Sequence, residues 1–299
     1  MSWDETTNSH HPTALHNALP PQLDLGRITA GLAGVPGVVG TVLGGSRARG
    51  THTPDSDVDL GLYYRGDVDT GALSDLAKEL AGPDARVTRQ GEWGPWVDGG
   101  GWLTIDGVHV DWIYRDLDRV RDAWVRAQRG VYTWNTQAGH PLGVPDFAYV
   151  GELAHGIVLD DPSGELGALR SMIRYPAPLA RALVENLWEA DFLVDIADKG
   201  VSRNDTAYVA LCLSRSFLLC AHALHGHEQV WLVNEKGAIA SAGQLDSAPR
   251  QFEQRVTKVL AHVGSSPIEL ARSIAAARSI VQETRSAASS SARSTMTGA

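Results

Sequence analysis

The first half of the chain alternates between short apolar runs and glycine-rich turns, a pattern typical of buried strands. Residues 38–43 (VVGTVL) form one such run, and residues 57–63 (DVDLGLY) alternate polar and apolar positions, as in a strand with one buried face. Two further runs, 102–105 and 108–113, flank an Asp-Gly dipeptide at 106–107 that is typical of a two-residue hairpin. This half of the chain therefore predicts a mixed sheet.

Apolar residues at helical spacing interrupt the first half and dominate the second. Residues 73–80 (LSDLAKEL) show this spacing and stop at a Gly-Pro pair, and a second helix is predicted at about 116–128. Beyond residue 150 the spacing predicts four longer helices, at 177–199, 206–225, 249–263 and 267–285. We therefore expect an α+β domain with a mixed sheet at 27–148, followed by an all-α helical-bundle domain at 149–285.

The two ends of the chain are predicted to lie outside these domains. Residues 1–26 are mostly polar and contain Pro20-Pro21, which is typical of a loose lead-in. Residues 286–299 (SAASSSARSTMTGA) include 11 Ser, Ala or Thr, so we expect a disordered tail.

Composition narrows the class of protein. The chain has 299 residues, of which 43% are hydrophobic and 20% charged, as in ordinary globular proteins. Two cysteines, Cys212 and Cys220, are too few for a disulfide scaffold. No run of 18 apolar residues and no basic, then apolar, leader is visible, so we expect a cytoplasmic protein with no membrane partner.

The formal net charge of -9 argues against a general nucleic-acid coat protein, which would need a basic surface to displace counterions. It is compatible with a protein that handles nucleotides through divalent metals, because a bound cation offsets part of the acidic excess.

Residues 44–64 (GGSRARGTHTPDSDVDLGLYY) carry the candidate chemistry. Asp57 and Asp59 lie two apart in a predicted strand, so their side chains share one face and repel each other. Carboxylate oxygens are the ligands that Mg²⁺ prefers, so a divalent cation would offset this repulsion. The turn Gly44-Gly45-Ser46 lets backbone N–H groups approach an anion closely. Together these features indicate a site for a metal-bound nucleoside triphosphate.

Asp111 is a third candidate, because it lies in an apolar run (VHVDWI) where a carboxylate needs a partner or a metal. If its strand pairs beside the Asp57 strand, three carboxylates converge, as a two-metal phosphoryl-transfer site requires. The alternative is a buried salt bridge with Arg115.

The pattern Gly45-Ser46, ten residues, Asp57-Val58-Asp59 and a later strand with an aspartate resembles the DNA polymerase beta-type nucleotidyltransferase superfamily. The fuller string is similar to its small bacterial members, the antibiotic-modifying aminoglycoside nucleotidyltransferases and the minimal nucleotidyltransferases. The resemblance implies that Asp57, Asp59 and Asp111 are catalytic carboxylates that hold Mg²⁺, two ions in all, and that Asp111 is a further ligand or the general base.

The same resemblance assigns the triphosphate to Gly44, Gly45 and Ser46, although Ser46 is also a candidate helix N-cap. For Arg47 and Arg49, phosphate contact and surface ion pairing are equally open, and we assign Arg49 to the nucleotide.

The helical half resembles the second domain of antibiotic nucleotidyltransferases more loosely. By that resemblance Lys236, in the turn of WLVNEKGA, reaches the nucleotide phosphates, and Glu185 or Glu189 activates the acceptor hydroxyl. The alternatives are a turn-capping lysine and a solvated charged helix face. We assign Glu185 to the catalytic set.

These features predict an adenylyltransferase-like enzyme that moves a nucleoside monophosphate, AMP from ATP or another NTP, onto a hydroxyl of a small, aminoglycoside-like acceptor and releases pyrophosphate. The alternatives are a protein or RNA acceptor, as in toxin–antitoxin pairs, and a non-catalytic nucleotide-binding module. Formation of a homo-oligomer is left open. Trp93, Trp96 and Trp102 lie beside the predicted site, where they either pack the hairpin or stack on a base or sugar ring.

Overall fold

The computed structural model describes residues 19–290, which divide into two compact units. The first unit runs to Trp124 and resumes at Asn135–Arg174, and the second contains Val125–Trp134 and the chain from Tyr175 onward. The sheet-containing unit thus extends to Arg174, whereas composition placed a domain boundary at residue 148. The reason is that the strand Ile157–Asp160, beyond that boundary, pairs with the strand Val38–Leu43 of the sheet.

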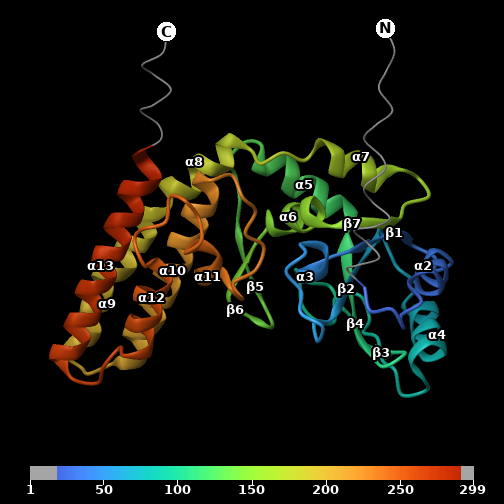
Figure 1. Ribbon diagram of the computed structural model, residues 1–299, viewed down its shortest axis with the longest axis horizontal. Helices are drawn as coiled ribbons and strands as arrows, with labels where there is room; N and C mark the ends of the chain where they lie inside the picture. Colours follow the sequence, from blue (N-terminus) through green and yellow to red (C-terminus); the bar gives the residue numbers. More distant parts are fainter. Residues whose placement is uncertain (1–18, 291–299) are drawn as a thin grey trace, which may run out of the picture. The chain divides into compact units, whose positions relative to one another are not determined.

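The first unit is built on a five-stranded mixed sheet of order β3-β4-β2-β1-β7 (Figure 1). The strands are β1 (Val38–Leu43), β2 (Val58–Tyr64), β3 (Gly100–Ile105), β4 (Val108–Asp116) and β7 (Ile157–Asp160). Only the β2–β4 pair is parallel. The predicted strands and hairpin are confirmed, and Asp106 and Gly107 both have positive φ (51° and 77°), as a tight two-residue hairpin turn requires.

One face of this sheet forms the core. Val58 and Leu60 of β2 and Val110 and Trp112 of β4 are fully buried there, beneath the helices α2 (Leu25–Ala33) and α4 (Thr70–Ala81). Burying each such side chain stabilises the fold by roughly 1.5–3 kcal/mol. Because strand side chains alternate between faces, the residues between these positions point to the opposite face, which carries the site.

The remaining elements of the first unit include one helix that is tied to the end of β4. They are α3 (Gly45–Ala48), α5 (Leu117–Ala127), which runs into the second unit, the hairpin β5 (Trp134–Gln137) and β6 (His140–Pro145), α6 (Ala148–His155) and α7 (Glu165–Met172). Arg115 of β4 is buried and bonds both carboxylate oxygens of Glu152 in α6, at 2.6 and 3.0 Å. Its guanidinium also lies 4.7 Å from the ring centre of Tyr149, so α6 is held firmly against the strand.

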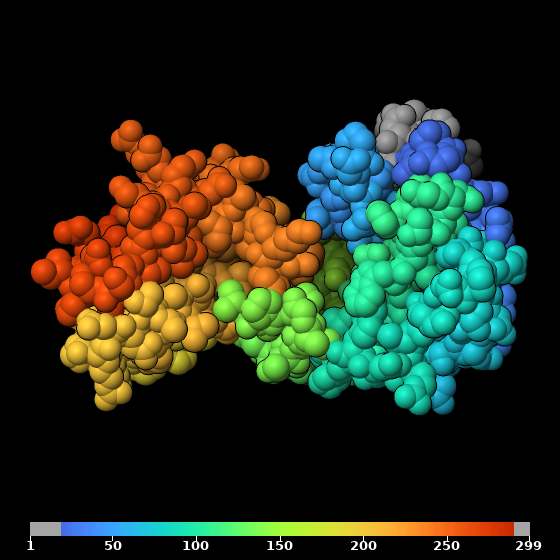
Figure 2. All heavy atoms as spheres, turned by 90° about the horizontal axis from the view of Figure 1, so that it is seen from below, coloured from blue at the N-terminus to red at the C-terminus, as the bar shows by residue number. Residues whose placement is uncertain are grey.

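The second unit is helical, as predicted. Its helices are α8 (Ala177–Glu185), α9 (Leu187–Val201), α10 (Thr206–His227), α11 (Ala238–Ala242), α12 (Phe252–Ala261) and α13 (Pro267–Ser290). The apolar α10 lies at its centre and packs on α8, α9 and α13, and α9 and α13 lie side by side in both views (Figure 1, Figure 2). The single helix predicted at 177–199 is two helices that join at Asn186.

Within residues 19–290, α10 is the one helix long and apolar enough to cross a membrane by length and composition. The sequence predicts no membrane span, because it contains no uninterrupted run of 18 apolar residues. However, 67% of the most apolar window is buried inside the protein, as is typical of a core helix.

Residues 286–290, which were predicted to belong to a disordered tail, are instead part of α13, which continues to Ser290, and Ala288 is buried. Alanine is the strongest helix former, which explains why a low-complexity segment extends this helix. Residues 291–299 of the predicted tail and 1–18 of the predicted lead-in lie outside the described residues.

Candidate functional site: neighbouring carboxylates on two strands of the sheet

Four residues form a row across the face of the sheet opposite the core. Trp102 of β3 pairs with Asp111 of β4, Asp111 is level with Asp59 of the parallel strand β2, and Gly44 follows β1. The N–H of Gly44 donates to the carbonyl of Asp59 at 2.8 Å. The parallel pairing of β2 and β4, on which convergence of the carboxylates depended, is thus confirmed, and Asp59 and Asp111 are neighbours.

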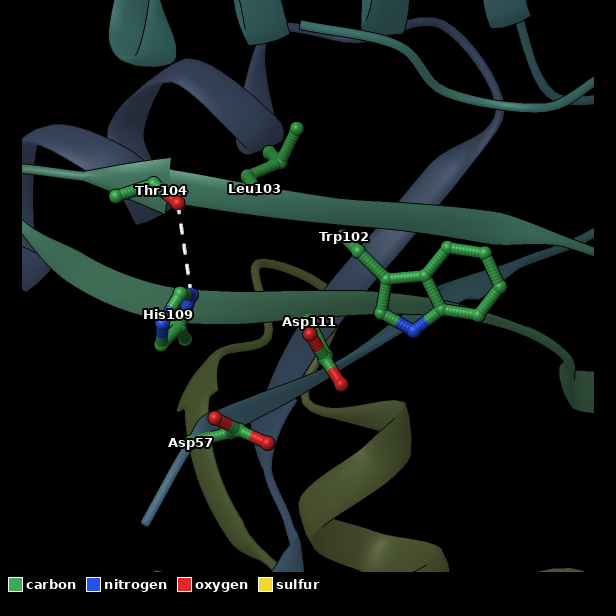
Figure 3. A pocket seen from close by; sticks show the side chains of 6 residues that line it. All are labelled: Asp57, Trp102, Leu103, Thr104, His109 and Asp111. Carbon is green, nitrogen blue, oxygen red and sulfur yellow. Dashed lines mark hydrogen bonds between the residues drawn. The ribbon is translucent and has the colours of Figure 1, made fainter. Parts of the chain in front are cut away.

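Asp57 immediately precedes β2 and contributes to a cavity of about 390 Å³ on the same face. The cavity is lined by Asp57, Trp102, Leu103, Thr104, His109 and Asp111. Figure 3 shows the carboxylates of Asp57 and Asp111 facing the same space, with the indole of Trp102 beside Asp111. Two acidic groups therefore open into one cavity with an aromatic wall.

The neighbouring carboxylates act electrostatically on Asp111. Burial, and then the negative charges of Asp59 and Asp57, raise the pKa of Asp111 to about 6. Desolvation and like charge both disfavour the ionised form, so the shift has the expected sign. A positive charge at this face of the sheet would lower the pKa of Asp111 again.

The turn between β1 and α3 is built against Asp59. Gly44 is the N-cap of α3, so the alternative role of Ser46 as N-cap is wrong. Gly45 has φ +62°, and a Cβ there would lie 1.7 Å from Asp59 Oδ2. The glycine thus permits both a left-handed backbone and a close approach to the carboxylate.

Arg47 has a different place from the one that either sequence alternative gave it. Its side chain is buried rather than on the surface, at 4% exposure. Nε donates to the carbonyls of Ser56 and Asp57 at 3.1 and 3.0 Å, and Nη2 donates to Ser56 at 2.5 Å. Arg47 therefore ties α3 to the segment that positions Asp57, while Arg49 lies exposed directly after α3.

Three residues that line this cavity were not predicted from the sequence, namely Leu103, Thr104 and His109. His109 lies two positions before Asp111 in the same strand, and its Nδ1 is 3.5 Å from the Thr104 hydroxyl across the hairpin. Strand alternation places His109 on the face of Asp111, and this signal was present in the sequence.

The alternative salt bridge of Asp111 with Arg115 is replaced by the pair of Arg115 with Glu152.

The residues assigned from the helical half belong to the second unit. Glu185 is exposed at the end of α8, and Lys236 is exposed in the turn before α11. Glu189 pairs with Arg215 at 3.2 Å and accepts from Asn186 at 3.1 Å. Roles for these residues at the carboxylates of the first unit stay predictions.

The donor set fits a hard divalent cation, because carboxylate oxygens are what Mg²⁺ prefers and Asp111 is destabilised by its acidic neighbours. As the side chains stand, no group of three or more metal-binding residues within 19–290 is arranged to hold an ion. The fit therefore rests on the chemistry and adjacency of the carboxylates.

Comparison with known proteins identifies the domain. Residues 33–98 match the sequence model of the nucleotidyltransferase domain family, a segment that contains the turn, α3 and β2 but ends before Asp111. No curated protein matches the chain. Similar solved structures include a nucleotidyltransferase-like protein from Exiguobacterium sibiricum 255-15, with 10% identity and a TM-score of 0.41 over 84% of this chain and 70% of that one. The family match covers the motif that the sequence had indicated, so the domain that carries Asp57 and Asp59 is a nucleotidyltransferase domain of the DNA polymerase beta-type superfamily.

Proposed function

We propose that this protein is an adenylyltransferase-like enzyme that transfers a nucleoside monophosphate, AMP from ATP, to a hydroxyl of a small acceptor in the cytoplasm. The observation that carries the proposal is the row in which Asp111 neighbours Asp59 and Asp59 lies against Gly45. A carboxylate pair beside a glycine turn joins a cation site to an anion site, which is what a metal-bound triphosphate needs.

Each part of the nucleotide has its candidate residues. The backbone N–H groups of Gly44 and Gly45 and the hydroxyl of Ser46 would bind the triphosphate, with Arg49 and Lys236 as further cations. Asp57, Asp59 and Asp111 would hold two Mg²⁺ ions, which would offset the negative charge of the triphosphate when bound.

The chain's own carboxylates supply the proton transfer. A carboxylate, Asp111 or Glu185, accepts the proton of the acceptor hydroxyl, whose oxygen forms a new bond to the α-phosphorus. The bond from the α-phosphorus to the oxygen that bridges to the β-phosphorus breaks, and that oxygen leaves with pyrophosphate. Asp111 is the candidate that lies on the sheet beside Asp59, whereas Glu185 belongs to the second unit. Positioning and charge stabilisation supply most of the acceleration in such a reaction.

The acidic character of the protein favours a small, cationic, hydroxylated acceptor such as an aminoglycoside-like compound. A net charge of -9 attracts a cation and repels an RNA acceptor. A protein acceptor has the same reaction chemistry and is separated by the experiment below.

The test incubates the full-length protein with Mg²⁺, ATP labelled at the α-phosphate and a panel of aminoglycosides. The proposal predicts soluble labelled product and equal release of pyrophosphate, both lost in Asp57→Asn and Asp59→Asn. Label in acid-precipitable material instead would favour a macromolecular acceptor. Transfer that survives both substitutions would contradict the assigned site.

A further inference from the structure

Trp102 is an unusually exposed aromatic side chain on the site face of the sheet. Its exposed fraction is 70%, although it lies between the buried Gly101 and Leu103 of β3. One side of its indole stacks on Trp93, with ring centres 4.5 Å apart and planes 26° apart. A large apolar ring left open beside a cavity is a feature of binding surfaces.

The stacked pair is held in place by buried neighbours. Gln137 is 5% exposed and clamps the segment that carries Trp93. Its Oε1 accepts from the N–H groups of Trp96 and Val97 at 3.2 and 2.9 Å, and its Nε2 donates to the carbonyl of Trp93 at 2.8 Å. The indole platform of Trp93 and Trp102 is therefore built into the fold, in the way that a positioned ligand contact requires.

The order of residues across the sheet indicates which of the two substrates would contact the indole of Trp102. Gly44, where the proposed function places the triphosphate, lies at one end of the row, and Trp102 lies at the other, beyond Asp59 and Asp111. In an in-line displacement the attacking and leaving oxygens lie on opposite sides of the phosphorus. With pyrophosphate leaving on the Gly44 side, the acceptor approaches from the side of Asp111 and Trp102.

We infer that the cavity beside Asp111 is the acceptor subsite, in which an acceptor ring bearing ammonium groups packs on the indole of Trp102. This inference rests on the proposed function and specifies its acceptor. An ammonium group close to an indole face gains a cation–π attraction, and the indole of Trp102 lines this cavity beside Asp111. His109 and Thr104 lie on the adjacent wall and offer polar contacts to ring hydroxyls. Trp102 is thus a specificity-determining residue for the acceptor.

The experiment uses the full chain labelled with 5-fluorotryptophan and followed by fluorine NMR. The protein contains nine tryptophans, and Trp102→Phe identifies the resonance of Trp102. Three probes are titrated: Mg²⁺ with the non-hydrolysable analogue α,β-methylene ATP, then 2-deoxystreptamine, then myo-inositol, each ring probe in the presence of the analogue. The two ring probes are matched six-membered polyols of which only the first carries ammonium groups. Calorimetry measures the affinity for the analogue in every variant.

We expect 2-deoxystreptamine to shift the Trp102 resonance and to bind at least about tenfold more tightly than myo-inositol. Trp102→Ala is expected to weaken that binding by about tenfold and Trp102→Phe by less, with analogue affinity unchanged in both. Met172→Ala, which truncates an exposed side chain of α7, is the control and should change neither.

Three results would overturn the inference while leaving the proposed function intact, provided that the parent binds the analogue. They are a Trp102 shift caused by the analogue alone, equal binding of both ring probes, and 2-deoxystreptamine binding that survives Trp102→Ala. Failure of the parent to bind the analogue would instead count against the proposed function itself, so the two failures are distinguishable.

Discussion

The carboxylate of Asp59 occupies the space where a side chain on Gly45 would begin. A Cβ on Gly45 would lie 1.7 Å from Asp59 Oδ2 and 2.6 Å from its Cγ. The φ of Gly45 is also positive, at +62°, which disfavours any residue with a Cβ. The turn Gly44-Gly45 and the carboxylate of Asp59 are therefore packed against each other.

Gly45→Ala should consequently disrupt both partners. We expect at least about tenfold weaker binding of Mg²⁺ and α,β-methylene ATP, and destabilisation by about 1–2 kcal/mol or more from the backbone penalty and the clash. Calorimetry and urea unfolding measure the two effects. Gly66→Ala is the matched control, because Gly66 has φ +67° and nothing within 4 Å of its Cβ position. That variant should share the backbone penalty but keep nucleotide affinity; equal affinity in both variants would contradict the role of the turn.

Arg47 of α3 and Arg49, which directly follows the helix, should respond differently to substitution. Arg47→Ala removes a buried guanidinium that holds the carbonyls of Ser56 and Asp57, so we expect it to cost about 2–4 kcal/mol of stability and to weaken nucleotide binding. Arg49→Ala removes an exposed cation and should weaken nucleotide binding while changing stability by less than about 0.5 kcal/mol. Urea unfolding measures the stability of each variant, and calorimetry measures its affinity for the nucleotide analogue. Equal stability of the two variants would contradict the buried clamp.

Asp111 should make stability fall as the pH rises. The pKa of Asp111 in the folded protein is about 6, above the usual 3.8. Between pH 3.8 and pH 6 the folded state is therefore protonated at Asp111 while the unfolded state is not, so raising the pH through this range lowers the free energy of unfolding. Without divalent cations, Asp111→Asn should therefore be more stable than the parent at neutral pH. The full shift corresponds to about 3 kcal/mol, which solvent screening at this half-exposed site reduces to about 1 kcal/mol.

Urea unfolding at about pH 4 and pH 7 measures this difference, with Asp84→Asn in the exposed turn after α4 as the control. The advantage of Asp111→Asn should shrink towards pH 4. A parent–variant difference that is the same at both pH values would contradict the electrostatic coupling of the three carboxylates.

His222 should make stability fall in the acidic direction. Burial, and then the positive charges of His225 and Arg215, lower the pKa of His222 to about 3. Below about pH 6.5 the histidine is protonated in the unfolded state, whereas in the folded state it stays neutral down to about pH 3. The free energy of unfolding is therefore highest above pH 6.5 and decreases as the pH falls from 6.5 towards 3. We expect a contribution of about 2 kcal/mol to the difference between pH 7 and pH 5.

His222→Phe keeps an aromatic ring against Trp134 and should flatten this pH dependence in urea unfolding. His262→Gln, which changes an exposed histidine of the same unit, should leave it as in the parent. An undiminished slope in His222→Phe would mean that other groups carry the acid sensitivity.

Much of the fold could be predicted from local patterns. The strands β1 and β2 and the hairpin of β3 and β4 follow from apolar alternation and from an Asp-Gly turn whose backbone needs two positive φ angles. The strand β7 could not be predicted in this way, because its four residues are all half-buried and show no alternation. The break between α8 and α9 at Asn186 could not be predicted either, because the apolar spacing continues from one helix into the next.

The candidate site divides in the same way. The spacing of Asp57 and Asp59 and the glycine turn predicted a metal–phosphate site, because strand alternation and backbone freedom are local properties. The role of Arg47 depends on the path of the loop to Asp57, which no local pattern encodes. Trp102, Thr104 and His109 line the proposed acceptor cavity because β3 pairs with β4. This pairing brings their side chains together, and the strand patterns taken one at a time do not predict it.

The central claim is that the row of carboxylates and the glycine turn bind a metal-bound nucleoside triphosphate. The most direct measurement titrates Mg²⁺ and α,β-methylene ATP into the protein by calorimetry, beside the double variant Asp57→Asn/Asp59→Asn. The account predicts binding by the parent that weakens at least tenfold in the variant, a loss of about 1.4 kcal/mol or more. Equal binding by both proteins, or no binding of the ATP, GTP, CTP or UTP analogue by the parent, would contradict it.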